Sequence, residues 1–233
     1  MLRCALCTLL IAAAGLGVGC TNANPSLFVL NNAKPDEMCK ISGDLGGDSD
    51  VQLTRGRWDV QPTGARYVLN LRVANNSMQN ANEVRSNTND VHMLSAEVEA
   101  LNPDGVPIPF QNAPGVMHPE SVPNPFVVPL AGGTVAASKD GVTPGVGFAR
   151  FPAIPNAYRV AVQQFLNGQL ANNRLPEVVL SIRLKGKTTG GHTLTTDSFL
   201  WPVTLCNGCE VCRGIPDATQ CEPGQDGYCY TLP

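Results

Sequence analysis

The sequence predicts an all-β fold, an immunoglobulin-like antiparallel β-sandwich with one short helix and a disulfide-rich C-terminal tail. Apolar and polar residues alternate with a period of two in several segments, as in strands that have one face on a core. The chain of 233 residues contains 23 Gly and 19 Pro and is only 15% charged, which is typical of strands joined by many turns. Five of its nine cysteines are crowded between residues 206 and 229, where no periodicity is found.

The N-terminus has the order of a secretory signal, a positive charge followed by an apolar run. Arg3 precedes residues 4–18, which are rich in Leu and Ala and too short for a comfortable membrane span. The run ends in Gly-Val-Gly-Cys20, which resembles a bacterial lipoprotein signal, whose cysteine receives diacylglycerol. Gly17 departs from the usual Leu, Val or Ile three residues before that cysteine, so ordinary cleavage after Ala23 remains the alternative.

This interpretation divides the chain into four parts. They are a signal peptide (1–19), a lipidated N-terminus and tether (20–38), a β-sandwich domain (39–205) and a Cys-rich tail (206–233).

Six cysteines remain in the exported chain under either cleavage. An even number in an oxidising compartment predicts three disulfides, with 15 pairings that the sequence does not separate. The spacing Cys-x2-Cys-x2-Cys would also suit an iron-sulfur cluster, but the next cysteine follows nine residues later without a Pro. We therefore expect disulfides, no metal and no cofactor. The six are Cys39, Cys206, Cys209, Cys212, Cys221 and Cys229.

The charge balance disfavours nucleic acid as a partner. Removing Arg3 from the 16 basic residues leaves 15 against 19 acidic ones, a net charge of −4, without a basic cluster. Asp44, Asp48 and Asp50 lie in a Gly-rich loop whose spacing does not match a calcium-binding EF-hand, so we interpret them as turn formers.

The first strands follow a short apolar island at residues 27–30, which is either an edge strand or a hydrophobic strap. Alternation predicts a strand at 67–74 with Tyr67, Leu69, Leu71 and Val73 inward, and a second at 94–100 with Leu94, Ala96, Val98 and Ala100 inward. The segment between them, 75–90, contains six Asn in 16 residues and is either a flexible insert or a recognition loop.

A turn at Asn102-Pro103-Asp104-Gly105 predicts a hairpin whose second arm, residues 106–110, lies at a sheet edge because it holds two prolines. Residues 111–156 carry many prolines, and we expect irregular crossings there with one or two short strands.

The second half of the chain holds the one helix candidate and the clearest hairpin. Residues 156–172 have helical spacing, with Asn156 as a cap. Val178, Leu180, Ile182 and Leu184 alternate inward, Gly190-Gly191 turns the chain, and Phe199, Trp201, Val203 and Leu205 alternate back.

Several segments together resemble the cysteine-rich predicted lipoproteins of myxobacteria and their relatives. They are Cys39 with its Asp-Gly loop, RGRWDV, YVLNLRVANN, SAEVEALNPDG, CNGCEVC and CEPGQDGYC. The resemblance implies an exported, anchored β protein and supplies no catalytic residues. Thr21 after the anchor, in place of Asp, resembles lipoproteins that move to the outer membrane; which face they occupy stays open.

The residues that could carry catalysis are few. His92, His118 and His192 lie in no nucleophile, zinc-protease or phosphate-loop motif, and Glu97 and Glu99 share the solvent face of one strand. We therefore expect a protein that is not an enzyme, bound to the membrane by its N-terminal lipid, with a protein or polysaccharide of the cell envelope as its partner. The alternatives are a passive coat lipoprotein, a small-ligand-binding protein or a hydrolase.

Overall fold

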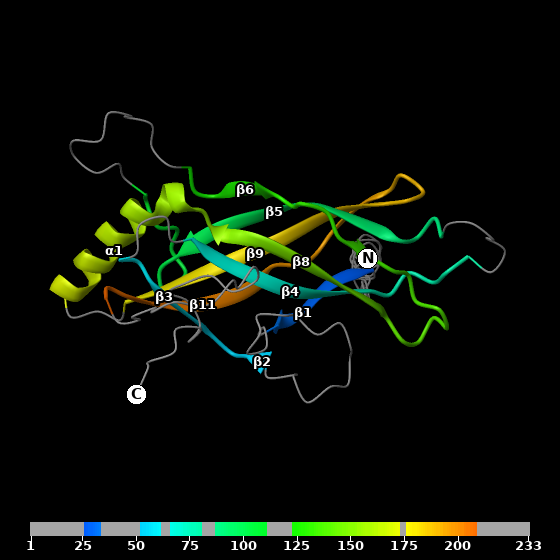
Figure 1. Cartoon of the computed structure of the whole chain (residues 1–233), viewed down its shortest axis with the longest axis horizontal. Helices are drawn as coiled ribbons and strands as arrows, with labels where there is room; N and C mark the ends of the chain where they lie inside the picture. The colour runs from blue at the N-terminus through cyan, green and yellow to red at the C-terminus, as the bar shows by residue number, and fades with distance from the viewer. Residues whose placement is uncertain are drawn as a thin grey trace, which may run out of the picture.

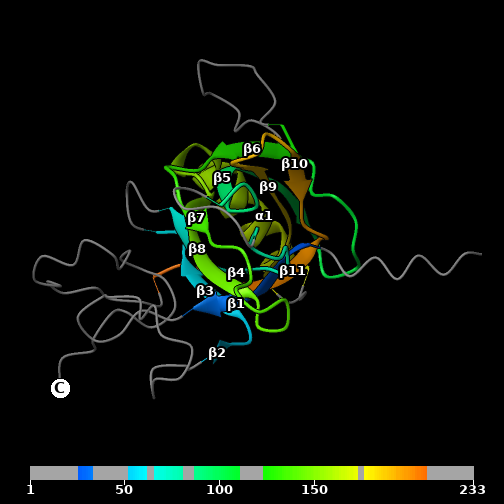
Figure 2. The same cartoon turned by 90° about the vertical axis from the view of Figure 1, so that its right-hand side faces the viewer.

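The structure is a computed structural model that describes residues 26–33, 52–61, 66–80, 87–110, 123–172 and 176–208. Its strands form two sheets packed face to face, seen as two layers in the end-on view of Figure 2. The prediction of an all-β sandwich with one short helix is confirmed. Within the described residues, no helix is long and apolar enough to cross a membrane.

The first sheet has the order β2-β1-β4-β8 and is entirely antiparallel. Its strands are β1 (Leu27–Ala33), β2 (Gln52–Leu53), β4 (Tyr67–Asn75) and β8 (Gly145–Ile154). The apolar island at 27–30 is thus a strand. The inward residues of β4 are buried as predicted, but its other face (Val68, Asn70, Arg72 and Ala74) is buried too, at 5% exposure or less.

The second sheet has the order β3-β11-β9-β5-β6, with β10 paired to β9 and β7 to β5. Its strands are β3 (Gly56–Asp59), β5 (Val91–Leu101), β6 (Phe126–Pro129), β7 (Thr134–Val135), β9 (Glu177–Thr188), β10 (Thr193–Thr195) and β11 (Phe199–Cys206). One pair departs from the antiparallel prediction, because β3 runs parallel to β11.

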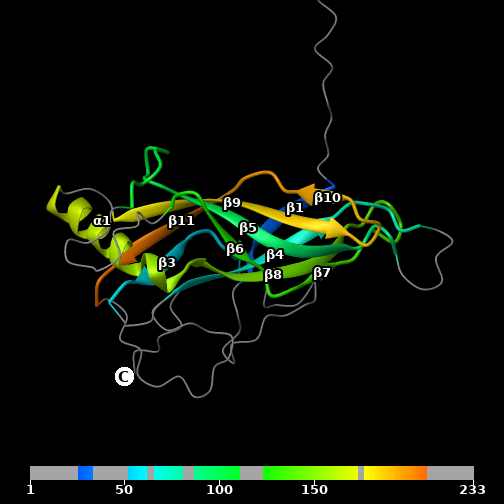
Figure 3. The same ribbon diagram turned by 90° about the horizontal axis from the view of Figure 1, so that it is seen from above.

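Strand registers define the two ends of the sandwich, which lie at opposite ends of its long axis in Figures 1 and 3. The 3-10 turn η1 (Asn156–Tyr158) and the helix α1 (Arg159–Ala171) lie between β8 and β9 and cover one end, here called the helix end. Asn156 does not cap α1; the cap position is Tyr158, without a side-chain hydrogen bond. At the other end, Leu27 pairs with Asn75, and Val91 with Thr188. We call this the loop end.

Inward side chains of both sheets form one core, which Phe110, Phe126 and Tyr158 continue under α1. Trp201 of β11 donates from Nε1 to the Tyr67 hydroxyl of β4 at 2.9 Å, so a buried hydrogen bond joins the two sheets.

One predicted strand phase is wrong, and one predicted hairpin arm does not form a strand. A bulge between Met93 and Ser95 makes Met93 buried and leaves Leu94 46% exposed, although we expected Leu94 inward. The turn at 102–105 does bring residues 106–108 back along the end of β5, with hydrogen bonds from Asn102 to Val106 and from Ile108 to Ala100. The arm makes only the single bridge from Leu101 to Pro107, and its residues Ile108 and Phe110 are buried as predicted.

On the side of the sandwich where β8 of the first sheet meets β7 of the second, the two backbones approach each other very closely. We call this the closed side. A Cβ added to Gly147 of β8 would lie 2.7 Å from the Thr134 carbonyl oxygen of β7. Only glycine allows the two sheets to approach this closely there.

Candidate functional site

Three connections that are far apart in the sequence converge at the loop end. They are the Asn-rich segment (76–80 and 87–90), the residues that follow β7 (136–144) and the turn between β9 and β10 (189–192). End loops on a rigid sandwich are the usual place for recognition. The hydrogen bonds among these segments therefore decide whether they form a defined surface.

Asn75 is the centre of this network, because it ends β4 with a side chain that is 0% exposed. Its Nδ2 donates to the Asn89 carbonyl at 2.9 Å and to the Val135 carbonyl at 3.3 Å, and its Oδ1 accepts from the Ser77 N–H at 2.9 Å. One amide thus satisfies backbone groups on both parts of the Asn-rich segment and on β7.

Asp90 joins the other two connections to the same network. Its Oδ1 accepts from the Ala137 N–H at 2.8 Å, and its carbonyl accepts from the Thr189 N–H at 2.8 Å. In addition, the Gln79 N–H donates to the Ser138 carbonyl and the Ser138 N–H to the Ser77 carbonyl, both at 2.8 Å. Backbone bonds therefore tie the Asn-rich segment to residues 136–144 on both sides of Met78.

The turn after Ser138 is held by the carboxylate of Asp140. Its oxygens accept from the Thr143 N–H at 2.6 Å, the Val142 N–H at 2.8 Å and the Thr143 hydroxyl at 2.9 Å. These bonds, led by the one from the Thr143 N–H, lower the pKa of Asp140 to about 2. The carboxylate is therefore ionised, and its role is to hold the turn.

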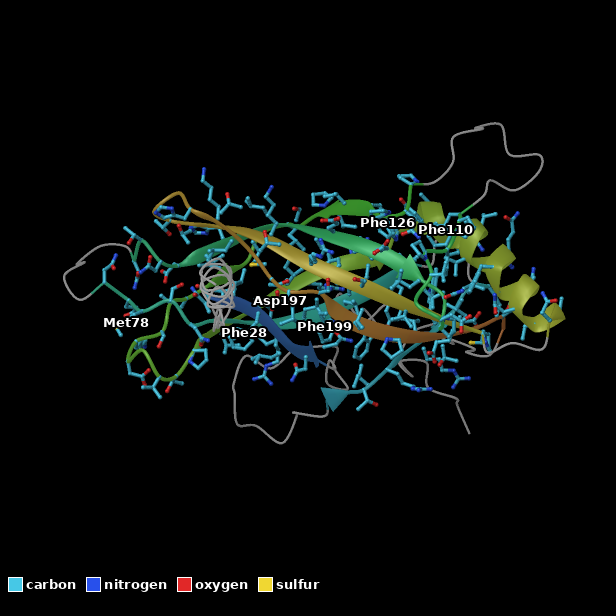
Figure 4. The ribbon with its side chains drawn as sticks, turned by 180° about the vertical axis from the view of Figure 1, so that it is seen from behind. Phe28, Met78, Phe110, Phe126, Asp197 and Phe199 are labelled. Carbon is cyan, nitrogen blue, oxygen red and sulfur yellow. The ribbon has the colours of Figure 1, made fainter. Side chains whose placement is uncertain are left out.

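On this bonded framework the loop end presents two apolar side chains to solvent. Val142 is 85% exposed and Met78 is 60% exposed, and the space beside Gly141 is occupied by the Met78 side chain. Lys139, three residues before Val142, is exposed too. Figure 4 labels Met78 at this end of the sandwich. Protein interfaces commonly combine an apolar centre with a polar rim.

The structure places two of the three histidines near this end. His92 is the second residue of β5, with Nδ1 3.1 Å from the Thr134 hydroxyl and Nε2 3.3 Å from the Thr189 hydroxyl. His192 is exposed in the β9 to β10 turn. His118 lies outside the described residues, as do Asp44, Asp48 and Asp50.

Glu97 and Glu99 both lie on the outer face of the second sheet, as the alternation predicts. Their register partners on β9 are Arg183 and Ser181. Among the described residues, no group of three His, Cys, Asp or Glu side chains could hold a metal ion.

Cys206 is the one residue of the predicted disulfide framework that the structure describes. It ends β11, its Sγ lies 3.7 Å from the Trp58 carbonyl oxygen, and it takes part in a disulfide. Cys20, Cys39, Cys209, Cys212, Cys221 and Cys229 lie outside the described residues. The three-bridge framework and the lipidation site therefore stay predictions.

Sequence reasoning singled out the Asn-rich segment, which includes Asp90, but missed its partners Ala137 and Ser138 and the turn that Asp140 holds. The Ser-Lys-Asp-Gly run at 138–141 is a turn signal that could have identified the second loop. Nothing in the sequence shows that this turn lies against residues 77–79.

Comparison with known proteins found no match to the chain among family models, curated proteins or solved structures.

Proposed function

We propose that the chain is a non-catalytic outer-membrane lipoprotein whose β-sandwich binds a protein or polysaccharide of the cell envelope through its loop end. The observation that carries this proposal is the bonded network around Asn75 and Asp90. Holding loops in one conformation before binding reduces the entropy lost on association, which favours recognition over a purely space-filling role.

The tether would keep this surface near the membrane. Cys20, the proposed site of lipidation, is six residues from Ser26, so the part of the tether that precedes β1 reaches about 20 Å when fully extended. Ser26 accepts a hydrogen bond from Asn76 at the loop end. An acylated chain would thus hold its loop end within reach of components at the membrane surface.

The anchor is tested by replacing Cys20 with Ala and separating membranes from soluble material. Acylation predicts that the wild-type protein stays with the outer membrane and the variant is released. Retention of the variant in the membrane would contradict the anchor.

The partner is tested by cross-linking intact cells, extracting them with mild detergent and identifying what copurifies. We expect one stoichiometric envelope component, which is lost when Val142 is replaced by Asp. The matched control is Leu170→Asp, since Leu170 is 52% exposed on α1 at the helix end. Purification of the wild-type protein alone would favour a passive coat lipoprotein, and equal loss in both variants would contradict binding through the loop end.

A further inference from the structure

The two long sides of the sandwich are protected to different degrees. On the closed side, β6 is bordered by Pro125 and ends at Pro129, which cannot donate a hydrogen bond to another strand. On the other side, β2 pairs with β1 only at Asn32 and Ala33. Among the residues that the structure describes, no strand pairs with the outer edge of residues 27–29 of β1, which precede a bulge at Leu30. Residues 27–31 contain no Pro and no charged residue.

Apolar side chains line this open side. Leu30 of β1 is 41% exposed, and Phe28 and Val29 are partly exposed. In the second sheet, Phe199 is partly exposed and Leu200 is 59% exposed. Figure 4 shows Phe28 and Phe199 on the same side of the sandwich.

The hydrogen bonds to β4 fix which backbone groups of β1 face outward. Leu27 pairs with Asn75, so Ser26 lies opposite Asn76, and the Ser26 carbonyl accepts from the Asn76 N–H at 2.8 Å. Bonded pairs alternate in an antiparallel ladder, so Phe28 bonds to β4. The N–H and C=O groups of Leu27 and Val29 therefore point to the open edge.

We propose that this edge pairs with the same edge of a second copy of the chain, antiparallel about a two-fold axis at Phe28. In this register, Leu27 of each copy exchanges two backbone hydrogen bonds with Val29 of the other. The two Phe28 side chains then face each other as a non-hydrogen-bonded pair, the position where Cβ atoms are closest. The pairing joins the two first sheets into one continuous sheet.

A second copy suits this edge because the stretch is uncharged and complementary to itself, so the two paired stretches carry no like charges. An edge this short buries less than the roughly 1,000 Å² that a stable dimer needs, so the pair is weak in free solution. Anchoring at Cys20 would raise the effective concentration of the copies on one membrane.

The test uses the unanchored Cys20→Ala protein, so its outcome is independent of lipidation and of the envelope partner. Phe28→Cys places two thiols at the distance a disulfide requires, and we expect it to form a covalent dimer under mild oxidation at high protein concentration. The control is Val127→Cys on β6, which replaces a residue that is 68% exposed. More dimer from the first variant than from the control supports the proposed pair geometry, because the proposed pair brings the two residues at position 28 closest together.

Equal dimer yields from both variants, or no dimer from Phe28→Cys, would overturn the pairing. A second measurement avoids added cysteines. Sedimentation velocity should show concentration-dependent association of the unanchored protein, which Phe28→Lys abolishes and Val127→Lys preserves, with circular dichroism unchanged in both. Association that is the same in both variants would also overturn the proposal.

Discussion

Replacing Asn75 with Ala tests whether the loop end is held together as the structure describes. The substitution removes three hydrogen bonds from a site that is 0% exposed and leaves two carbonyls and one N–H without their partner. At about 1 kcal/mol for each bond, and somewhat more where the remaining group stays buried, we expect the free energy of unfolding to fall by about 3 kcal/mol.

The assay is urea unfolding of the Cys20→Ala protein with its disulfides oxidised, followed by tryptophan fluorescence. Asn76→Ala is the matched control, because Asn76 is the next residue and is exposed. Its free energy of unfolding should change by less than about 0.5 kcal/mol. A loss below about 1 kcal/mol for Asn75→Ala, or a loss equal to the control, would refute the central role of this amide.

Three further predictions concern the turn, the closed side and the core. The pKa of Asp140 is lowered to about 2, so the stability that its carboxylate contributes is present above the ordinary pKa of 3.8 and is lost as the pH falls towards 2. The NMR chemical shift of the Thr143 amide should therefore change with a midpoint near pH 2. A midpoint near pH 4 would contradict the hydrogen bonds to Asp140. Gly147→Ala should lower the free energy of unfolding by about 1–3 kcal/mol, because the added Cβ would collide with the Thr134 carbonyl oxygen. The control is Gly168→Ala, whose added Cβ has no atom within 4 Å and should not lower the free energy of unfolding. Equal effects of the two substitutions would disprove the close approach of β7 and β8. Trp201→Ala should cost about 3–5 kcal/mol by urea titration, because its side chain is 3% exposed, and a loss below about 1 kcal/mol would show that it is not in the core.

The parts of the fold that the sequence predicts are those in which burial follows a simple period. In β9 the inward residues from Val178 to Leu184 are fully buried, because this strand lies between neighbours on both sides and has one face on the core. α1 was found for the same reason: its buried positions, such as Val162 and Leu166, recur at helical spacing.

The sequence fails where tertiary contacts override the period. At Leu94 a bulge adds one residue and shifts the inward face to Met93, which no local pattern signals. In β4 the alternation predicts that the side chains of Asn70 and Arg72 face solvent, but both residues are nearly fully buried. The pairing of Met78 with Ser138, sixty residues apart, likewise depends on the complete fold.

The central claim, that the loop end recognises an envelope partner, is tested most directly by photo-cross-linking in living cells. A photoreactive amino acid at Val142, 85% exposed at the loop end, is compared with the same residue at Leu170 on α1. The account predicts one discrete adduct from position 142 and none from position 170. Adducts from position 170 alone, or the same adducts from both positions, would contradict recognition by the loop end.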